Sequence, residues 1–107
     1  MKVLFDHNVP VGLARRFLGH QVELASTRGW AAKSNGVLLD EAEQAGFDIL
    51  LTCDQSLPYQ QNLHGRTIAV VILPTNNLVR LRANIAVIGS SVDFAQPGQV
   101  VRVALRR

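Results

Sequence analysis

The sequence predicts a three-layer α/β/α domain whose sheet is mostly parallel and has about five strands. Several short apolar runs lack the alternation of a half-exposed strand, which is typical of strands buried on both faces of a parallel sheet. These runs alternate along the chain with segments of helical spacing, so each strand–helix–strand unit predicts a right-handed crossover. A chain of 107 residues, 48% hydrophobic and 18% charged, fits one folded domain spanning residues 1–107.

The order of the elements follows from the apolar spacing and from the residues that begin and end helices. Asn8 and Pro10 begin the first helix and Gly19 ends it, while Gly46 ends the second. The third helix starts at Asn76 or Asn77 and stops at the Gly-Ser-Ser run that begins at residue 89. The predicted strands are residues 2–6, 20–25, 47–52, 67–73 and 99–105, and the predicted helices are residues 10–18, 34–45 and 77–88. Residues 55–65 are expected to form a loop or a short helix at the edge of the crevice.

Two of the predicted strands lead into an aspartate, Asp6 after the first and Asp54 after the third. Ligands of open parallel sheets bind outside the carboxyl ends of the strands, so we expect Asp6 and Asp54 to lie side by side there. Two such carboxylates repel each other unless a cation or a shared proton lies between them. The pair therefore predicts a divalent-metal site. The structural alternative is that each aspartate only fixes its own loop by accepting backbone N–H bonds.

The charge pattern permits a nucleic-acid partner. The net charge is +3, and most of the basic residues are arginines, whose planar guanidinium suits phosphate. Arg28 and Lys33 flank the expected crevice and are the candidate phosphate contacts; the simpler alternative is a solvated surface. No apolar stretch is long enough to cross a bilayer, and no signal peptide is recognisable, so we expect a cytoplasmic protein without membrane contact. The single cysteine, Cys53, fits a reducing compartment.

Four segments in this order resemble the small stand-alone PIN-like domains found beside bacterial antitoxin-like partners. The segments are Asp6-His7-Asn8-Val9-Pro10, Leu18-Gly19-His20-Gln21-Val22, the run from Ser34 to Ala42, and Ile49-Leu50-Leu51-Thr52-Cys53-Asp54. The resemblance implies a Mg²⁺- or Mn²⁺-dependent ribonuclease in which Asp6 and Asp54 are catalytic residues and metal ligands. It also implies that Asn8 caps the first helix and reaches a metal-bound water.

The chain departs from the PIN-like pattern at Asn35 and Ser56, where that family commonly has acids. Asn35 is expected to be a helix cap, Asp40 is a more distant acid that can reach the site, and Thr52 can hold a phosphate or a water. Two functions therefore stay open: a metal-dependent endoribonuclease serving as the toxin of a toxin–antitoxin pair, or a catalytically degenerate module that binds RNA or a partner protein. A receiver domain or a phosphatase fits less well, because the latter needs an aspartate at residue 8, which is Asn8.

Three further expectations concern single side chains and the oligomer. His7 should face away from Asp6 if the strand continues, and Cys53 should point away from its two neighbours. An apolar face of the third helix that includes Val87 leaves room for a homodimer.

Overall fold

The computed structural model of the chain describes residues 1–17 and 19–105. Leu18, which the spacing assigns to the first helix, and the basic residues Arg106 and Arg107 lie outside the described residues. The elements in chain order are β1 (Lys2–Phe5), η1 (Val11–Arg16), β2 (Gln21–Leu24), α1 (Asn35–Gln44), β3 (Ile49–Thr52), α2 (Leu57–Gln60), β4 (Ala69–Ile72), α3 (Leu78–Ala83), α4 (Ile85–Phe94) and β5 (Val100–Arg102). Within these residues, no helix is both long and apolar enough to span a membrane.

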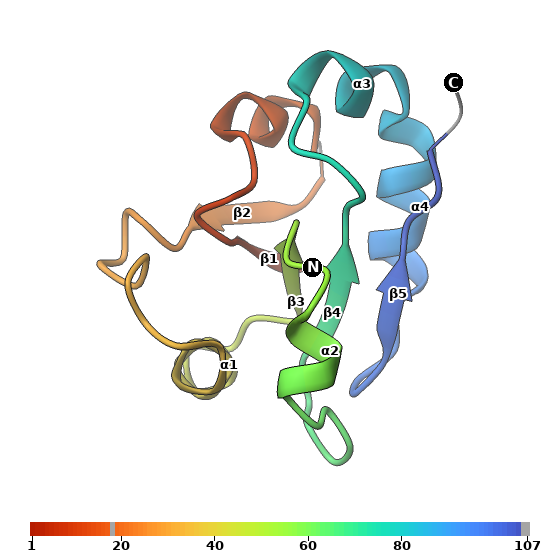
Figure 1. Cartoon of the computed structure of the whole chain (residues 1–107). Helices are drawn as coiled ribbons and strands as arrows, with labels where there is room; N and C mark the ends of the chain where they lie inside the picture. The colour runs from red at the N-terminus through yellow and green to blue at the C-terminus, as the bar shows by residue number, and fades with distance from the viewer. Residues whose placement is uncertain (18, 106–107) are drawn as a thin grey trace.

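The five strands form one sheet in the order β2-β1-β3-β4-β5, and every pairing is parallel (Figure 1). This confirms the predicted fold class. The register pairs Phe5 with Leu51 and Thr52 with Ile72, so β1, β3 and β4 end at the same edge of the sheet. That edge carries the loops that hold both predicted aspartates.

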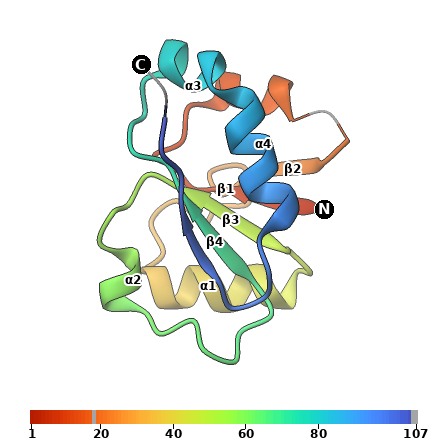
Figure 2. The same cartoon turned by 90° about the vertical axis from the view of Figure 1, so that its right-hand side faces the viewer.

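Helices cover both faces of the sheet and bury it (Figures 1 and 2). In β1, β3 and β4, odd-numbered residues such as Phe5 and Leu51 pack against η1, α3 and α4, and even-numbered ones such as Leu4 and Leu50 pack against α1 and α2. Because successive side chains of a strand point to opposite faces, two apolar layers require strands without polar alternation. This is why β1, β3 and β4 appear as continuous apolar runs in the sequence.

The helix after β1 is shorter than expected and is not capped as expected. η1 is a single 3₁₀ segment that follows Pro10, and no side chain caps its start. The cap predicted at Asn8 is therefore wrong, because the chain makes a turn after Asp6 and Asn8 lies before the helix. The second predicted helix is confirmed as α1, and Gly46 follows it with φ of 82°, a conformation that favours glycine.

The third predicted helix is in fact two helices that meet at Asn84. Asn84 is buried with φ −116° and ψ 22°, and its Nδ2 donates to the carbonyl of Arg80 at 2.9 Å, which ends α3. The Gly-Ser-Ser run lies inside α4, so the predicted stop there is wrong. A glycine in a helix costs only about 1 kcal/mol, and here the burial of Ile88 and Val92 on either side of the run outweighs it.

Candidate functional site

Asp6 lies directly after β1 and is only 5% exposed. Its backbone N–H donates to the carbonyl of Leu51 at 2.9 Å, which continues the pairing of β1 with β3 by one residue. Its Oδ2 accepts the hydroxyl of Thr52 at 2.8 Å, and its Oδ1 accepts the backbone N–H of His7 at 2.8 Å. A buried carboxylate needs such donors, because an unpaired one is expensive to remove from water.

Thr52, at the end of β3, joins the two aspartates through one hydroxyl. The fully buried hydroxyl donates to Oδ2 of Asp6 at 2.8 Å and accepts the backbone N–H of Asp54 at 3.1 Å. The parallel pairing of β1 with β3 is what places the two residues together. The structure thus brings Asp6, Thr52 and Asp54 to one edge of the sheet, as their positions after the strands predict.

Asp54 is an ionised carboxylate held by polar donors. Its Oδ1 accepts the hydroxyl of Ser56 at 2.6 Å and the backbone N–H of Ser56 at 2.9 Å, and its Oδ2 accepts Nδ2 of Asn35 at 3.1 Å. The Ser56 hydroxyl, the Asn35 amide and the charge of His7 lower the pKa of Asp54 below its usual value, against an opposing effect of burial. These donors favour the charged form that a cation or a proton acceptor requires.

Asn35 is not a helix cap. Ser34 occupies the cap position of α1 without a side-chain bond, and Asn35 is the first helical residue. Nδ2 of Asn35 also donates to Oε1 of Gln60 at 2.9 Å, and Nε2 of Gln60 donates to Oγ of Ser56 at 3.2 Å. The start of α1 is therefore tied to α2 around Asp54, and Asn35 acts as a hydrogen-bond donor where the PIN-like pattern has an acid.

Asn8 and His7 occupy positions that the strand pattern does not predict. Oδ1 of Asn8 accepts the backbone N–H of Cys53 at 3.0 Å, so Asn8 fixes the loop after β3. Nδ1 of His7 lies 3.0 Å from Oδ1 of Asp6, and the His7 side chain is 58% exposed. The expectation that His7 faces away from Asp6 is wrong, because the chain turns after Asp6, where the N–H of Val9 donates to the carbonyl of Asp6 at 3.0 Å.

Asp40 lies away from the two aspartates. Its carboxylate pairs with Arg66 at 2.8 Å, and Arg66 precedes β4 at the opposite edge of the sheet. Asp40 is five residues further along α1 than Asn35, a rise of about 7.5 Å toward that opposite edge. The structure therefore does not support Asp40 as a site residue.

Arg28 is also placed differently from its expected role. Its Nε pairs with Glu23 at 2.8 Å, and its guanidinium lies 4.9 Å from the ring centre of Trp30 and 5.0 Å from that of Phe47. It covers the rim of the core on the α1 side and is already matched by an acid. Lys33 lies half-buried in the loop before α1.

Cys53 has the character of a structural residue. Its side chain packs against the layer that contains η1, α3 and α4, opposite to Thr52, and its Sγ lies 3.4 Å from the carbonyl of Thr75. Burial, together with the charge of Asp6, raises the pKa of the thiol to about 11. A thiol of this kind is a weak nucleophile at neutral pH.

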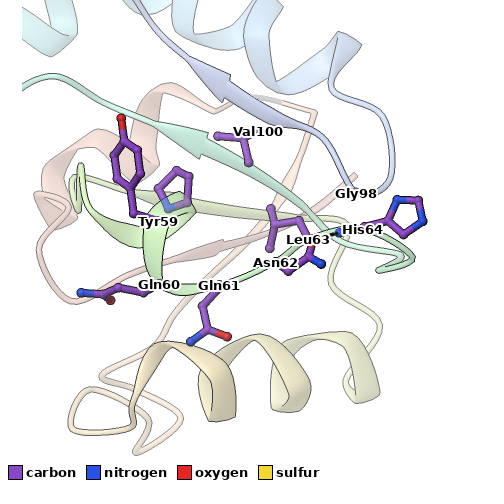
Figure 3. Close-up of a pocket in the computed structure, with 9 residues that line it drawn as sticks. Tyr59, Gln60, Gln61, Asn62, Leu63, His64, Gly98 and Val100 are labelled. Carbon is purple, nitrogen blue, oxygen red and sulfur yellow. Dashed lines mark hydrogen bonds between the residues drawn. The ribbon is translucent and has the colours of Figure 1, made fainter.

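A hollow of about 600 Å³ lies next to the site, between α2 and the start of β5 (Figure 3). Its lining is Pro58, Tyr59, Gln60, Gln61, Asn62, Leu63, His64, Gly98 and Val100. Gln60 connects it to Asp54 through Asn35 and Ser56. Tyr59 is 85% exposed, with the guanidinium of Arg102 5.7 Å from its ring centre. The sequence predicts residues 55–65 as a loop or a short helix at the edge of the crevice, and α2 confirms the short helix, but the hollow beside it is not predicted.

The donor set at this edge suits a hard cation better than zinc. In the part of the chain that the structure describes, no group of three or more His, Cys, Asp or Glu gathers where a metal ion could be held. Two carboxylates remain, and Mg²⁺ commonly binds one or two carboxylates and completes its shell with water and substrate phosphate. Asp6 and Asp54 can serve as that pair, with Thr52, Ser56 and Asn35 fixing their oxygens.

Comparisons with protein-family models, with curated proteins and with solved structures found no significant match for this chain.

Proposed function

We propose that the protein is a PIN-like, Mg²⁺- or Mn²⁺-dependent endoribonuclease in which Asp6 and Asp54 bind the metal. The observation that carries this proposal is the Thr52 hydroxyl, which donates to the Asp6 carboxylate and accepts the backbone N–H of Asp54, so that the two residues are neighbours at the carboxyl edge of a parallel sheet. The order of the segments that resemble PIN-like domains supports the same function.

The chain's own residues prepare the site for phosphodiester hydrolysis. Ser56 and Asn35 keep Asp54 ionised, and Thr52 fixes the carboxylate of Asp6. A bound metal ion supplies polarisation of the phosphate, a hydroxide nucleophile and compensation of charge at the leaving oxygen. The exposed imidazole of His7, beside Asp6, is placed to donate a hydrogen bond to a phosphate oxygen.

A second candidate function is a degenerate PIN-like module that binds RNA or a partner protein without cleavage. One observation favours it: each carboxylate oxygen of Asp6 and Asp54 already accepts a hydrogen bond from the protein. The amide of Asn35 supplies one of these bonds where a third acid would strengthen metal binding. In this alternative the hydrogen bonds have a structural role and stabilise the two charged carboxylates without a cation.

Metal-dependent cleavage of RNA separates the two functions. Purified protein is incubated with structured and single-stranded RNA, with Mn²⁺, with Mg²⁺ or with EDTA. We expect cleavage only with metal, and its loss in Asp6→Asn and in Asp54→Asn. Asp40→Asn is the matched control, because it removes the same charge from a carboxylate paired with Arg66 at the other edge. RNA binding without cleavage in the presence of either metal identifies the degenerate module.

The biological setting is proposed from the resemblance alone. The protein is a cytoplasmic toxin component whose partner is an antitoxin-like protein. Its expression in bacterial cells should arrest their growth, and Asp54→Asn should abolish the arrest.

The proposed homodimer has less apolar surface than expected, because Ile88 is in the core and Ile85 packs against it, which leaves Val87 40% exposed. Light scattering of the purified chain tests the dimer.

A further inference from the structure

Acidic and basic side chains are unevenly divided between the two faces of the sheet. Four of the eight acids lie in or just after α1, namely Asp40, Glu41, Glu43 and Asp48. Residues 7–22 and 55–92 contain no acid, and these two segments include η1, α3 and most of α4. Asp93, the acid near the end of α4, is paired with His20 at 2.8 Å. The layer opposite α1 is therefore basic.

Four exposed arginines belong to this basic layer, two in η1 and two in α3. They are Arg15, Arg16, Arg80 and Arg82, here called the η1–α3 arginines. Among residues 1–17 and 19–105, none of the four pairs with an acid. By contrast, Arg28 pairs with Glu23, and Arg66 pairs with Asp40 and Glu43. Apart from Arg102, whose guanidinium donates to Gln55, the described arginines without an acidic partner thus lie on one surface.

The two arginine-bearing helices are in direct contact. The side chain of Leu78 fills the space beside Gly12, where a Cβ would come within 2.8 Å of it, and Nη2 of Arg82 lies 3.9 Å from the same point. The guanidinium of Arg82 therefore reaches across to η1. Figures 1 and 2 both show η1 and α3 side by side at one end of the molecule.

This surface is continuous with the edge that holds the two aspartates. Asp6 precedes η1 by a short turn, and the segment before α3 starts beside β3, where the N–H of Leu73 donates to the carbonyl of Thr52 at 2.8 Å. The same segment contacts Cys53 at Thr75. Both helices thus leave the sheet from the carboxyl edge, next to the candidate site.

From this placement we propose that the η1–α3 arginines bind the phosphate backbone of a single-stranded RNA that passes over Asp6 and Asp54. The inference rests on the proposed function and names the surface that delivers its substrate. Guanidinium groups without an acidic partner bind phosphates bidentately. The carboxylates at the edge repel phosphates unless a cation lies between. On the far side of the aspartates, Tyr59, flanked by Arg102, offers an exposed ring for a base to stack on. Stacking on this ring requires a base that is not paired with another base, which favours a single strand over a duplex.

Salt-dependent RNA binding tests this surface separately from catalysis. A fluorescent single-stranded oligoribonucleotide is titrated in EDTA, and fluorescence anisotropy gives the Kd. With about 0.7 counterions released per phosphate contact, four contacts predict a rise in Kd of about 50-fold between about 50 and 200 mM salt. In Arg80→Gln/Arg82→Gln, two contacts remain, and we expect weaker binding with a rise of about seven-fold. The matched control, Arg28→Gln/Arg66→Gln, removes the same charge from two arginines that are already paired with acids on the α1 side, and it should keep the wild-type Kd and salt dependence.

The outcomes separate this surface from the enzyme. Thermal melts first establish that both double variants are folded. If Arg80→Gln/Arg82→Gln then binds the RNA with the wild-type Kd, the proposed surface is overturned, even if RNA is cleaved. A duplex DNA or an acidic peptide that binds as tightly as the RNA overturns the assignment of the partner. Asp6→Asn/Asp54→Asn should still bind the RNA. If binding depends on Arg80 and Arg82 but no metal yields cleavage, the surface stands and the nuclease proposal fails.

Discussion

Replacing Thr52 with valine tests whether one hydroxyl organises the candidate site. Valine keeps the shape of the buried side chain but removes the donor to Asp6 and the acceptor for the N–H of Asp54. A hydrogen bond to a charged group contributes about 1.5–3 kcal/mol, and the bond to the N–H about 1 kcal/mol. The added methyl group recovers about 0.8 kcal/mol, so we expect Thr52→Val to lower the free energy of unfolding by about 2–3 kcal/mol.

Urea unfolding at neutral pH measures this loss, and Thr52→Ser is the matched control. Serine keeps the hydroxyl and loses only a buried methyl group, which costs about 1 kcal/mol. An unfolding entropy of about 2.1 cal/mol/K per residue over 107 residues means that Thr52→Val should also lower Tm by about 9–13 °C. If Thr52→Val is as stable as Thr52→Ser or more so, the hydroxyl does not hold the two aspartates, and the reasoning from this network fails.

Three further predictions concern the same edge. Because the pKa of Asp54 is lowered, the hydrogen bonds to its carboxylate stabilise the fold at pH values above the ordinary pKa of 3.8. Ser56→Ala should therefore have a lower free energy of unfolding than wild type at pH 7, and this difference should disappear as the pH falls below 3.8, as urea unfolding at several pH values would show. Cys53, with a thiol pKa of about 11, should react slowly with iodoacetamide at pH 8 and rapidly in urea, as mass spectrometry of alkylated protein would show. Asn35→Asp removes a donor from Asp54 and adds a third carboxylate, so without metal it should lose about 2 kcal/mol of stability, and Mn²⁺ should raise its Tm more than that of wild type. If Mn²⁺ raised the Tm of Asn35→Asp and of wild type by the same amount, no cation would bind between residue 35 and Asp54.

The fold class and the positions of Asp6 and Asp54 could be predicted from the sequence because they depend on strand pattern. Short apolar runs that alternate with helical segments are typical of a parallel sheet covered by helices on both faces. Once the strands are parallel, residues that follow two neighbouring strands emerge at one edge whatever their side chains contact. The position of Thr52 at this edge is predictable for the same reason, since it is the last residue of β3.

Predictions failed where tertiary contacts decide the local conformation. The break at Asn84 depends on a buried side-chain bond to the carbonyl of Arg80, which no apolar spacing reveals. Strand alternation predicts the wrong orientation for His7, because the chain already turns after Asp6. The pairing of Arg28 with Glu23 of β2 is not visible in the sequence, because the two become neighbours only when the loop after β2 folds back. In each case the missing information is a contact between residues that the pattern treats separately.

The division of charge connects the fold to the proposed function. The helices on the two faces of the sheet come from different parts of the chain. The sheet therefore separates the acids of α1 from the arginines of η1 and α3. The carboxyl edge is the border between the two faces, and Asp6 and Asp54 lie on it. In the proposed function, the phosphates of an RNA held by the η1–α3 arginines would lie near these carboxylates, and repulsion would oppose their approach unless a cation compensates. In the proposed function, metal would therefore control how closely the RNA approaches Asp6 and Asp54, whereas binding to the η1–α3 arginines would not require it.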